Sequence, residues 1–281
     1  MRSVEDYNHL KPVKPTHRIA YGNHPEQFGD LYLPNILPEP HSQFPVIILL
    51  HGGCWRAQYG LSQLGQLSQA LTQRGFAVWN LEFRRLGNGG GWPVTFEDVA
   101  QGTDFLQTIA LNYHLDLARV ISMGHSAGGH LALWLAGRHH LPETSQLKRD
   151  SPLALIGVVS LAGIPDLIAG VAQQICRGAC EELVGGLPAA FPERYHETSP
   201  HFLLPFNVPH WHLVGENDPI VPVDYLRPFI EKARQQDTVH FEIIPEIGHF
   251  EMVMPDTGSW PVIKEVLKQA VTRLIRNTGN A

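Results

Sequence analysis

The sequence contains no long hydrophobic run and no run of basic residues. Its strongest apolar run near the N-terminus, VIILL at residues 46–50, is far shorter than the roughly 20 residues that cross a bilayer. The first residues, MRSVEDYNHLKPVKP, lack the apolar core of a signal peptide. The formal net charge is −6, so we expect no nucleic acid and no membrane as partner. These absences predict a cytoplasmic protein.

Cysteine is scarce: the chain has 3, an odd number that is poorly suited to a disulfide framework. Cys176 and Cys180 lie close together, but no second Cys or His pair nearby completes a zinc site. The glycine-rich run at residues 87–91 lacks the Lys-Ser/Thr of a phosphate-binding loop and the spacing of a dinucleotide fingerprint. We therefore expect no metal and no cofactor.

Apolar segments typical of strands alternate with segments of helical periodicity along the chain. Continuous apolar runs such as PVIILLHGG, residues 45–53, suit strands that are buried on both faces. The alternation predicts an α/β fold with a mostly parallel central sheet flanked by helices. The length of 281 residues fits a single domain over residues 1–281. Residues 164–205 carry no strand pattern, and we expect them to form a small cap insertion.

A serine lies in a glycine-rich turn between a predicted strand and a predicted helix. The residues Gly124-His125-Ser126-Ala127-Gly128 fit G-x-S-x-G, the pattern of a nucleophile elbow. Such a turn exposes the serine hydroxyl above the sheet, and the free N–H groups of the following helix point to the same place. The alternative is a glycine-rich turn with an incidental serine. The strand before and the helix after favour Ser126 as a nucleophile.

A second glycine pair follows another predicted strand, in LLHGGCW at residues 49–55. In a serine hydrolase, backbone N–H groups of this loop complete the oxyanion hole together with the N–H after the nucleophile. The candidates are Gly53 and Cys54 from the loop and Ala127 from the elbow. We expect His51 to hold the loop by hydrogen bonds. Cys54 is either a reactive thiol or a small buried residue, and the second interpretation is favoured.

A serine nucleophile needs a general base, and 16 histidines compete for that role. The order along the chain in this fold is nucleophile, acid, histidine. His249, in IPEIGHFEM after the last predicted strand, satisfies that order. Asp218, in LVGENDPIVP, is the acid nearest a strand end, and its role would be to orient the imidazole.

The segments HGGCW, GHSAGGH, GENDPIVP and GHFE together resemble the α/β-hydrolase superfamily over most of the chain. They look like its esterase branch, which includes hormone-sensitive-lipase-like esterases and kynurenine formamidase-like enzymes. YGNHPEQFGDLYLP and EFRRLGNGGGWP also look like formamidase- and feruloyl-esterase-related sequences. The resemblance implies an α/β-hydrolase fold, a triad and an oxyanion hole. It places the triad on Ser126, Asp218 and His249, and the oxyanion donors on Gly53, Cys54 and Ala127.

The predicted function is hydrolysis of small carboxylic esters by a serine hydrolase through an acyl-enzyme intermediate. An arylformamidase and a non-catalytic binding protein of the same fold are the alternatives. Trp55 and Trp92 would wall a substrate pocket or pack in the core, and Asp166 would face the pocket or cap a helix. The expected partner is a small ester or formamide. Residues 164–205 could serve as a lid or as the contact of a homodimer.

Overall fold

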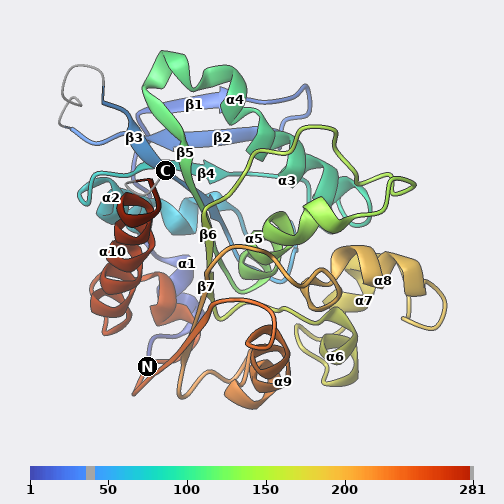
Figure 1. Cartoon of the computed structure of the whole chain (residues 1–281). Helices are drawn as coiled ribbons and strands as arrows, with labels where there is room; N and C mark the ends of the chain where they lie inside the picture. The colour runs from blue at the N-terminus through green and yellow to red at the C-terminus, as the bar shows by residue number, and fades with distance from the viewer. Residues whose placement is uncertain (36–41, 279–281) are drawn as a thin grey trace.

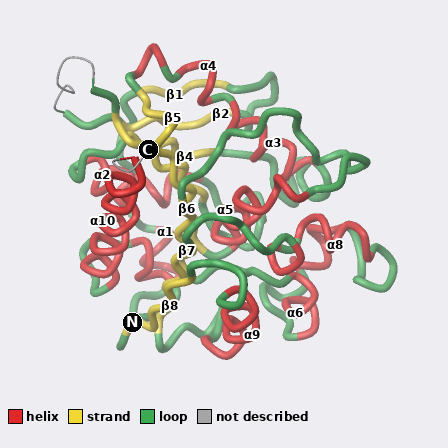
Figure 2. Tube along the Cα trace, in the orientation of Figure 1, coloured by secondary structure: helices red, strands yellow, loops and turns green. Residues whose placement is uncertain are grey.

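The computed structural model describes residues 1–35 and 42–278, with side chains to residue 271. Its strands form one sheet in the order β1-β2-β4-β3-β5-β6-β7-β8 (Figures 1 and 2). The strands are β1 (His17–Ala20), β2 (Phe28–Tyr32), β3 (Phe44–Leu50), β4 (Ala77–Leu81), β5 (Leu115–His125), β6 (Gly157–Leu161), β7 (His210–Gly215) and β8 (Val239–Ile244).

The sheet is parallel except at one edge. β2 pairs antiparallel with β1 and with β4, and every other pair of neighbours is parallel. All residues of β4, β6 and β7 are buried, as continuous apolar runs require when helices cover both faces of a sheet. The predicted mostly parallel sheet is confirmed.

Helices cover both faces of the sheet. In Figure 1, α2 and α10 lie on one face, and α3, α5 and α9 lie on the other. The helices are α1 (Val4–Asn8), α2 (Gly65–Thr72), α3 (Val94–Asp104), α4 (Leu106–Ile109), α5 (Ala127–Gly137), α6 (Leu167–Ala172), α7 (Ala179–Val184), α8 (Pro192–Thr198), α9 (Val223–Ala233) and α10 (Ser259–Thr278). Short 3-10 turns cover Leu61–Leu64, Leu111–Tyr113, Arg138–His140, Pro200–Phe202 and Phe250–Val253. None of these helices is long and apolar enough to span a membrane, among the residues described.

The segment 164–205 lies between β6 and β7 and contains α6, α7 and α8. We call it the cap. A disulfide with an S–S distance of 2.06 Å joins Cys176 of the cap to Cys54 of the loop after β3. The odd number of cysteines did not indicate this bond, and both interpretations of Cys54, as a reactive thiol or as a small buried residue, are wrong because its sulfur is bonded to Cys176. The partners are 122 residues apart in sequence, so only the folding of the cap over that loop brings them together. Cys180 remains as a free, buried thiol.

Candidate active site

The predicted site residues all follow the carboxyl ends of parallel strands. Gly53 and Cys54 follow β3, Ser126 follows β5, and Asp218 and His249 come after β7 and β8. The carboxyl ends of parallel strands lie at one edge of a sheet, where open α/β sheets bind their ligands. The topology therefore gathers these residues at one edge.

Ser126 occupies a strained turn. Its backbone has φ 54° and ψ −120°, and it is the N-cap of α5. Side chains are excluded on both sides of it, because a Cβ on Gly124 would lie 2.1 Å from the carbonyl oxygen of Gly128, and a Cβ on Gly128 would lie 2.1 Å from that of Leu50. The glycines of the G-x-S-x-G pattern thus allow β5 to turn into α5 while that helix packs against β3.

Asp218 and His249 form a buried pair. Oδ2 of Asp218 lies 2.6 Å from Nδ1 of His249, and the side chains are almost fully buried. The other oxygen of Asp218 accepts hydrogen bonds from the N–H groups of Ile220, at 2.9 Å, and Val221, at 2.8 Å. These amides fix the carboxylate, and the carboxylate fixes the imidazole. Nε2 of His249 is then the ring atom left for proton transfer.

His125 connects the loop of His249 to the elbow. Its Nε2 lies 3.0 Å from the carbonyl oxygen of His249, and the two imidazole rings are 4.6 Å apart between centroids. Burial, together with the neighbouring His249, lowers the pKa of His125 well below its ordinary value. His125 is therefore neutral and carries its proton on Nε2, which donates to the carbonyl. Sequence reasoning missed this connecting role of His125.

The loop after β3 has an unusual backbone. Gly53, Cys54 and Trp55 all have positive φ, at 102°, 52° and 54°. Within the described chain, the backbone N–H groups of Gly53, Cys54 and Ala127 donate to no backbone carbonyl. A Cβ on Gly52 would lie 3.1 Å from Cβ of Ser126, so the loop abuts the elbow. Amides from both segments can therefore face an oxygen that forms on a carbonyl attacked by Ser126.

A buried ionic cluster anchors this loop. Nε2 of His51 lies 2.9 Å from Oε1 of Glu82, and Arg85 donates to the same oxygen. Oε2 of Glu82 accepts the N–H of Leu61 at 3.1 Å. Burial alone would raise the pKa of Glu82, but the charges and hydrogen bonds of His51 and Arg85 outweigh it and lower the pKa to about 2. One hydrogen bond expected of His51 is thus made to an ionised carboxylate, and its Nδ1 lies 2.8 Å from the carbonyl oxygen of Gly52 in the loop itself.

Trp55 is packed in the interior. Its side chain is buried, its indole N–H donates to Nδ1 of His130 at 3.2 Å, and Nε2 of His130 donates to the carbonyl of Thr198 at 2.8 Å. His130 belongs to α5, and Thr198 belongs to α8 of the cap. The contacts of Trp55 therefore match the packing alternative. They join the loop after β3, the helix after Ser126 and the cap.

Trp92 contacts the cap, and Asp166 stabilises a helix within the cap. The backbone N–H of Trp92 donates to the carbonyl of Leu183 at 2.7 Å, and the guanidinium of Arg194 lies 3.9 Å from the centre of its ring. Asp166 is the N-cap of α6 and accepts the N–H of Ala169 at 3.0 Å. The helix-capping alternative for Asp166 is therefore observed. A pocket role for these residues stays a prediction.

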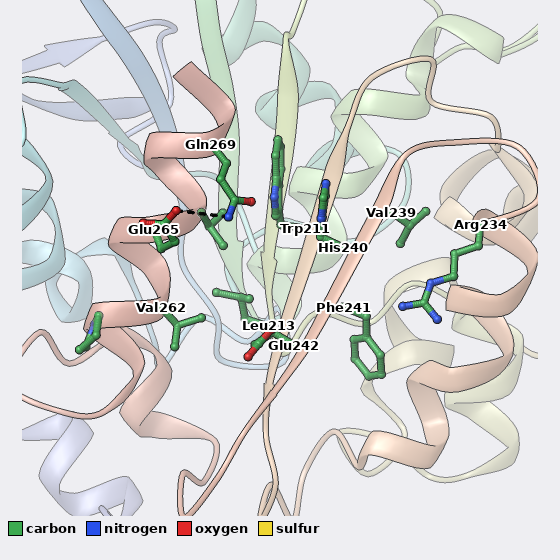
Figure 3. A pocket seen from close by; sticks show the side chains of 12 residues that line it. Trp211, Leu213, Arg234, Val239, His240, Phe241, Glu242, Val262, Glu265 and Gln269 are labelled. Carbon is green, nitrogen blue, oxygen red and sulfur yellow. Dashed lines mark hydrogen bonds between the residues drawn. The ribbon is translucent and has the colours of Figure 1, made fainter. Parts of the chain in front are cut away.

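A groove of about 570 Å³ lies away from these residues, between β7, β8 and α10 (Figure 3). Trp211, His240 and Gln269 are among the side chains that line it, and none of the predicted site residues is in its lining. It offers no nucleophile with an adjacent base, so hydrolysis is not assigned to it.

A family model matches the part of the chain that runs from β2 to α9. Residues 30–232 match the model of the BD-FAE family. The chain belongs to the BD-FAE family. This match includes Ser126 and Asp218 and ends before His249.

Two curated relatives of this BD-FAE chain are an esterase and a methylesterase by name. Esterase LipC of Mycobacterium tuberculosis is 25% identical over 247 residues, which are 83% of this chain and 59% of LipC. The isoprenylcysteine alpha-carbonyl methylesterase ICME of Arabidopsis thaliana is 29% identical over 126 residues, 45% of this chain and 28% of ICME. The chain thus spans a little over half of LipC and about a quarter of the methylesterase.

Solved structures establish the fold of this BD-FAE chain. Esterase B of Lactobacillus rhamnosis, inhibited by a tributyrin phosphonate, aligns with a TM-score of 0.79 at 18% identity, covering 99% of this chain and 93% of that protein. A bifunctional GH43-CE protein of Bacteroides eggerthii aligns with a TM-score of 0.75 at 24% identity, covering 90% of this chain and 37% of that one. The sheet order and these similarities identify the α/β-hydrolase fold.

Proposed function

We propose that this chain is a carboxylic ester hydrolase with Ser126 as its nucleophile, His249 as its general base and Asp218 as the residue that orients His249. The observation that carries the proposal is the buried Asp218–His249 pair, which His125 ties to the strained turn of Ser126. Ser126 is itself buried, with 2% of its surface exposed, so the expectation that the turn exposes its hydroxyl to solvent is not met. A histidine oriented by a carboxylate is the general base that activates a serine hydroxyl at neutral pH.

The reaction takes place in two halves. Ser126 Oγ attacks the ester carbonyl and gives its proton to Nε2 of His249, while the carbonyl oxygen becomes an oxyanion. The N–H groups of Gly53, Cys54 and Ala127 stabilise that charge, each contributing about 3–4 kcal/mol to the lowering of the barrier. His249 then protonates the departing alcohol. Water, activated by the same imidazole, releases the acid from Ser126.

Esters are favoured over formamides as substrates. The curated relatives LipC and ICME carry the names esterase and methylesterase, and the alternative arylformamidase has no comparable support among them. We therefore propose a small ester as the substrate.

The test uses a fluorophosphonate, which phosphorylates an activated serine. The wild-type protein should hydrolyse p-nitrophenyl acetate and carry the adduct on Ser126, located by mass spectrometry of peptides. Ser126→Ala should fold normally, take up no label and lose about four to six decades of kcat. Ser62→Ala, at an exposed serine outside the site, is the matched control. Unlabelled Ser126 in folded wild-type protein would refute the proposal.

We also propose the cytoplasmic location that the sequence predicts; the Cys54–Cys176 disulfide is the observation that stands against it, and it offers a direct test. Cytoplasmic cysteines are usually kept reduced, whereas oxidising compartments preserve disulfides. Cells would be lysed in an alkylating reagent and the peptides of Cys54 and Cys176 analysed. Alkylated cysteines support the cytoplasm, and an intact disulfide in the freshly trapped protein would contradict it.

A further inference from the structure

The N-terminal helix α1 lies against the loop that carries His249. The backbone N–H of Arg2 donates to Oε1 of Glu251, and the guanidinium of Arg2 lies 3.0 Å from Oδ2 of Asp256. A capping box between Ser3 and Asp6 fixes the first turn of α1. These contacts attach the helix to the residues directly after His249.

Tyr7 is the buried residue of α1, with 2% of its surface exposed. The centre of its ring lies 5.3 Å from that of Phe250, 6.2 Å from that of His125 and 6.4 Å from that of Tyr59. Phe250 follows His249, and His125 precedes Ser126. Tyr59 packs on the oxyanion loop, since a Cβ on Gly53 would lie 2.3 Å from its Cβ. Tyr7 therefore touches all three segments of the proposed site.

The hydroxyl of Tyr7 has no hydrogen-bond partner within the described chain. Burial raises the pKa of Tyr7, so its hydroxyl keeps its proton and remains a donor. Buried tyrosine hydroxyls usually find a partner, and those of Tyr21 and Tyr32 do so on backbone carbonyls, at 2.8 Å and 2.9 Å. Tyr7 differs from them because its ring contacts His125 and Phe250, which adjoin Ser126 and His249 in the chain.

The position of Tyr7 also indicates which part of a substrate it meets. Under the proposed function, the N–H groups of Gly53, Cys54 and Ala127 already donate hydrogen bonds to the oxyanion. The ring closest to that of Tyr7 belongs to Phe250, next to His249 in the chain. His249 protonates the departing alcohol under the proposed function, so a residue that packs on Phe250 is a candidate to meet the alcohol portion.

We propose that Tyr7 is a substrate-contacting residue whose hydroxyl donates a hydrogen bond to an oxygen on the alcohol side of the bound ester. This inference rests on the proposed function. Helix α1 thereby forms a wall of the site, and the N-terminal segment contributes to ester recognition. The Tyr7 hydroxyl would strengthen the binding of an ester whose alcohol portion carries an oxygen. An ester without that oxygen would bind more weakly, because the buried hydroxyl would stay unpaired.

The test is Tyr7→Phe, which keeps the ring and removes only the hydroxyl. Glycerol monoacetate, whose alcohol portion carries further oxygens, is the substrate, and Tyr32→Phe is the matched control. We expect kcat/KM of Tyr7→Phe to fall about tenfold or more, with an unchanged or higher Tm because an unpartnered hydroxyl has been removed. Tyr32→Phe should keep kcat/KM within about twofold, since its hydroxyl bonds the backbone of Val13 outside the site.

A second measurement separates substrate contact from an effect on the triad. The rate at which methyl fluorophosphonate labels Ser126 should stay within about twofold of wild type in Tyr7→Phe, because fluoride leaves without an alcohol portion. Equal losses of labelling and turnover would place Tyr7 in the support of His249 and overturn the proposal. Unchanged turnover would also overturn it. Either result would overturn only the role of Tyr7. The proposed function would still hold if Ser126 of the wild-type protein carries the label.

Discussion

Asp218 holds His249 through one carboxylate oxygen and is itself held through the other. Its Oδ2 meets Nδ1 of His249 at 2.6 Å, while Oδ1 accepts from the N–H groups of Ile220 and Val221. The carboxylate thus cannot rotate without breaking two hydrogen bonds. Its orientation, and with it the tautomer of His249, is fixed before any substrate binds.

Asp218→Asn should therefore cost activity far more than stability. Asn keeps an oxygen for the two amides, but its NH₂ group would face Nδ1 of His249 and favour the wrong tautomer. We expect kcat for p-nitrophenyl acetate to fall by about 10⁴ with nearly unchanged Tm. Asp224→Asn, at a side chain that is 92% exposed and outside the site, should change kcat little. Equal activities of the two variants would remove Asp218 from the proposed triad.

The anchor of the oxyanion loop can be tested at Glu82. Glu82→Gln removes the charge that pairs with Arg85 and His51 and leaves Glu26 as the remaining carboxylate partner of the buried guanidinium. We expect the free energy of unfolding to fall by about 3–5 kcal/mol, measured by urea denaturation. In the fraction that remains folded, kcat should fall while KM changes little, because the loop supplies donors to the transition state. A raised KM with normal kcat would contradict this assignment.

The sequence was sufficient for those parts of the site that depend on local pattern. The parallel strands were predictable from runs such as residues 45–53, and the elbow from the glycines around Ser126. These glycines are required by backbone contacts at 2.1 Å, and such requirements leave a recognisable pattern. Asp218 and His249 could be chosen because each follows a predicted strand in the expected order.

Contacts between distant segments could not be predicted in this way. Cys54 and Cys176 are 122 residues apart, and counting cysteines carries no information on which loops meet. No sequence pattern indicated that α1 would place Tyr7 against His125, because a helix of five residues is too short for its periodicity to be recognised. Trp55 was equally ambiguous, since an aromatic side chain suits a pocket and a core alike. Only the position of His130 decides that Trp55 is packed inside.

The disulfide should stabilise the cap and the oxyanion loop together. Reduction, or Cys176→Ser, frees Cys54 within a stretch of three residues with positive φ. We expect the free energy of unfolding to fall by about 2–4 kcal/mol, because the bond closes a long loop. The kcat should fall by about two- to tenfold, since a looser loop aims its donors less well. Arg56 and Glu182, paired at 2.8 Å, still link loop and cap, so activity should survive.

Cys180→Ala serves as the control for that experiment. Its thiol is free and buried, so this variant should respond to dithiothreitol as the wild type does. Cys176→Ser should not respond at all, because it has no disulfide to reduce. A wild-type protein whose Tm and kcat were the same with and without the reductant, after the thiols had been shown to be free, would contradict the proposed restraint.

Stability should fall on acidification through buried histidines. Burial lowers the pKa of His130 from 6.5 to about 4 and lowers those of His125, His210 and His212. Near pH 8 these rings are neutral in both the folded and the unfolded chain, so they add no pH dependence there. As the pH falls toward 4, the unfolded chain binds protons that the folded chain does not. Each such ring then costs about 1.4 kcal/mol per pH unit.

Urea denaturation between pH 8 and pH 4.5 measures this slope. The free energy of unfolding should be level above pH 7 and should decline below about pH 6.5, where the unfolded histidines titrate. His130→Gln should lower stability at pH 8, because it disturbs the bonds to Trp55 and Thr198, and should make the acid slope shallower. His17→Gln, at an exposed position, should leave the slope unchanged. An equal slope in wild type and His130→Gln would mean that His130 is protonated in the folded protein, which would break its hydrogen bond from Trp55.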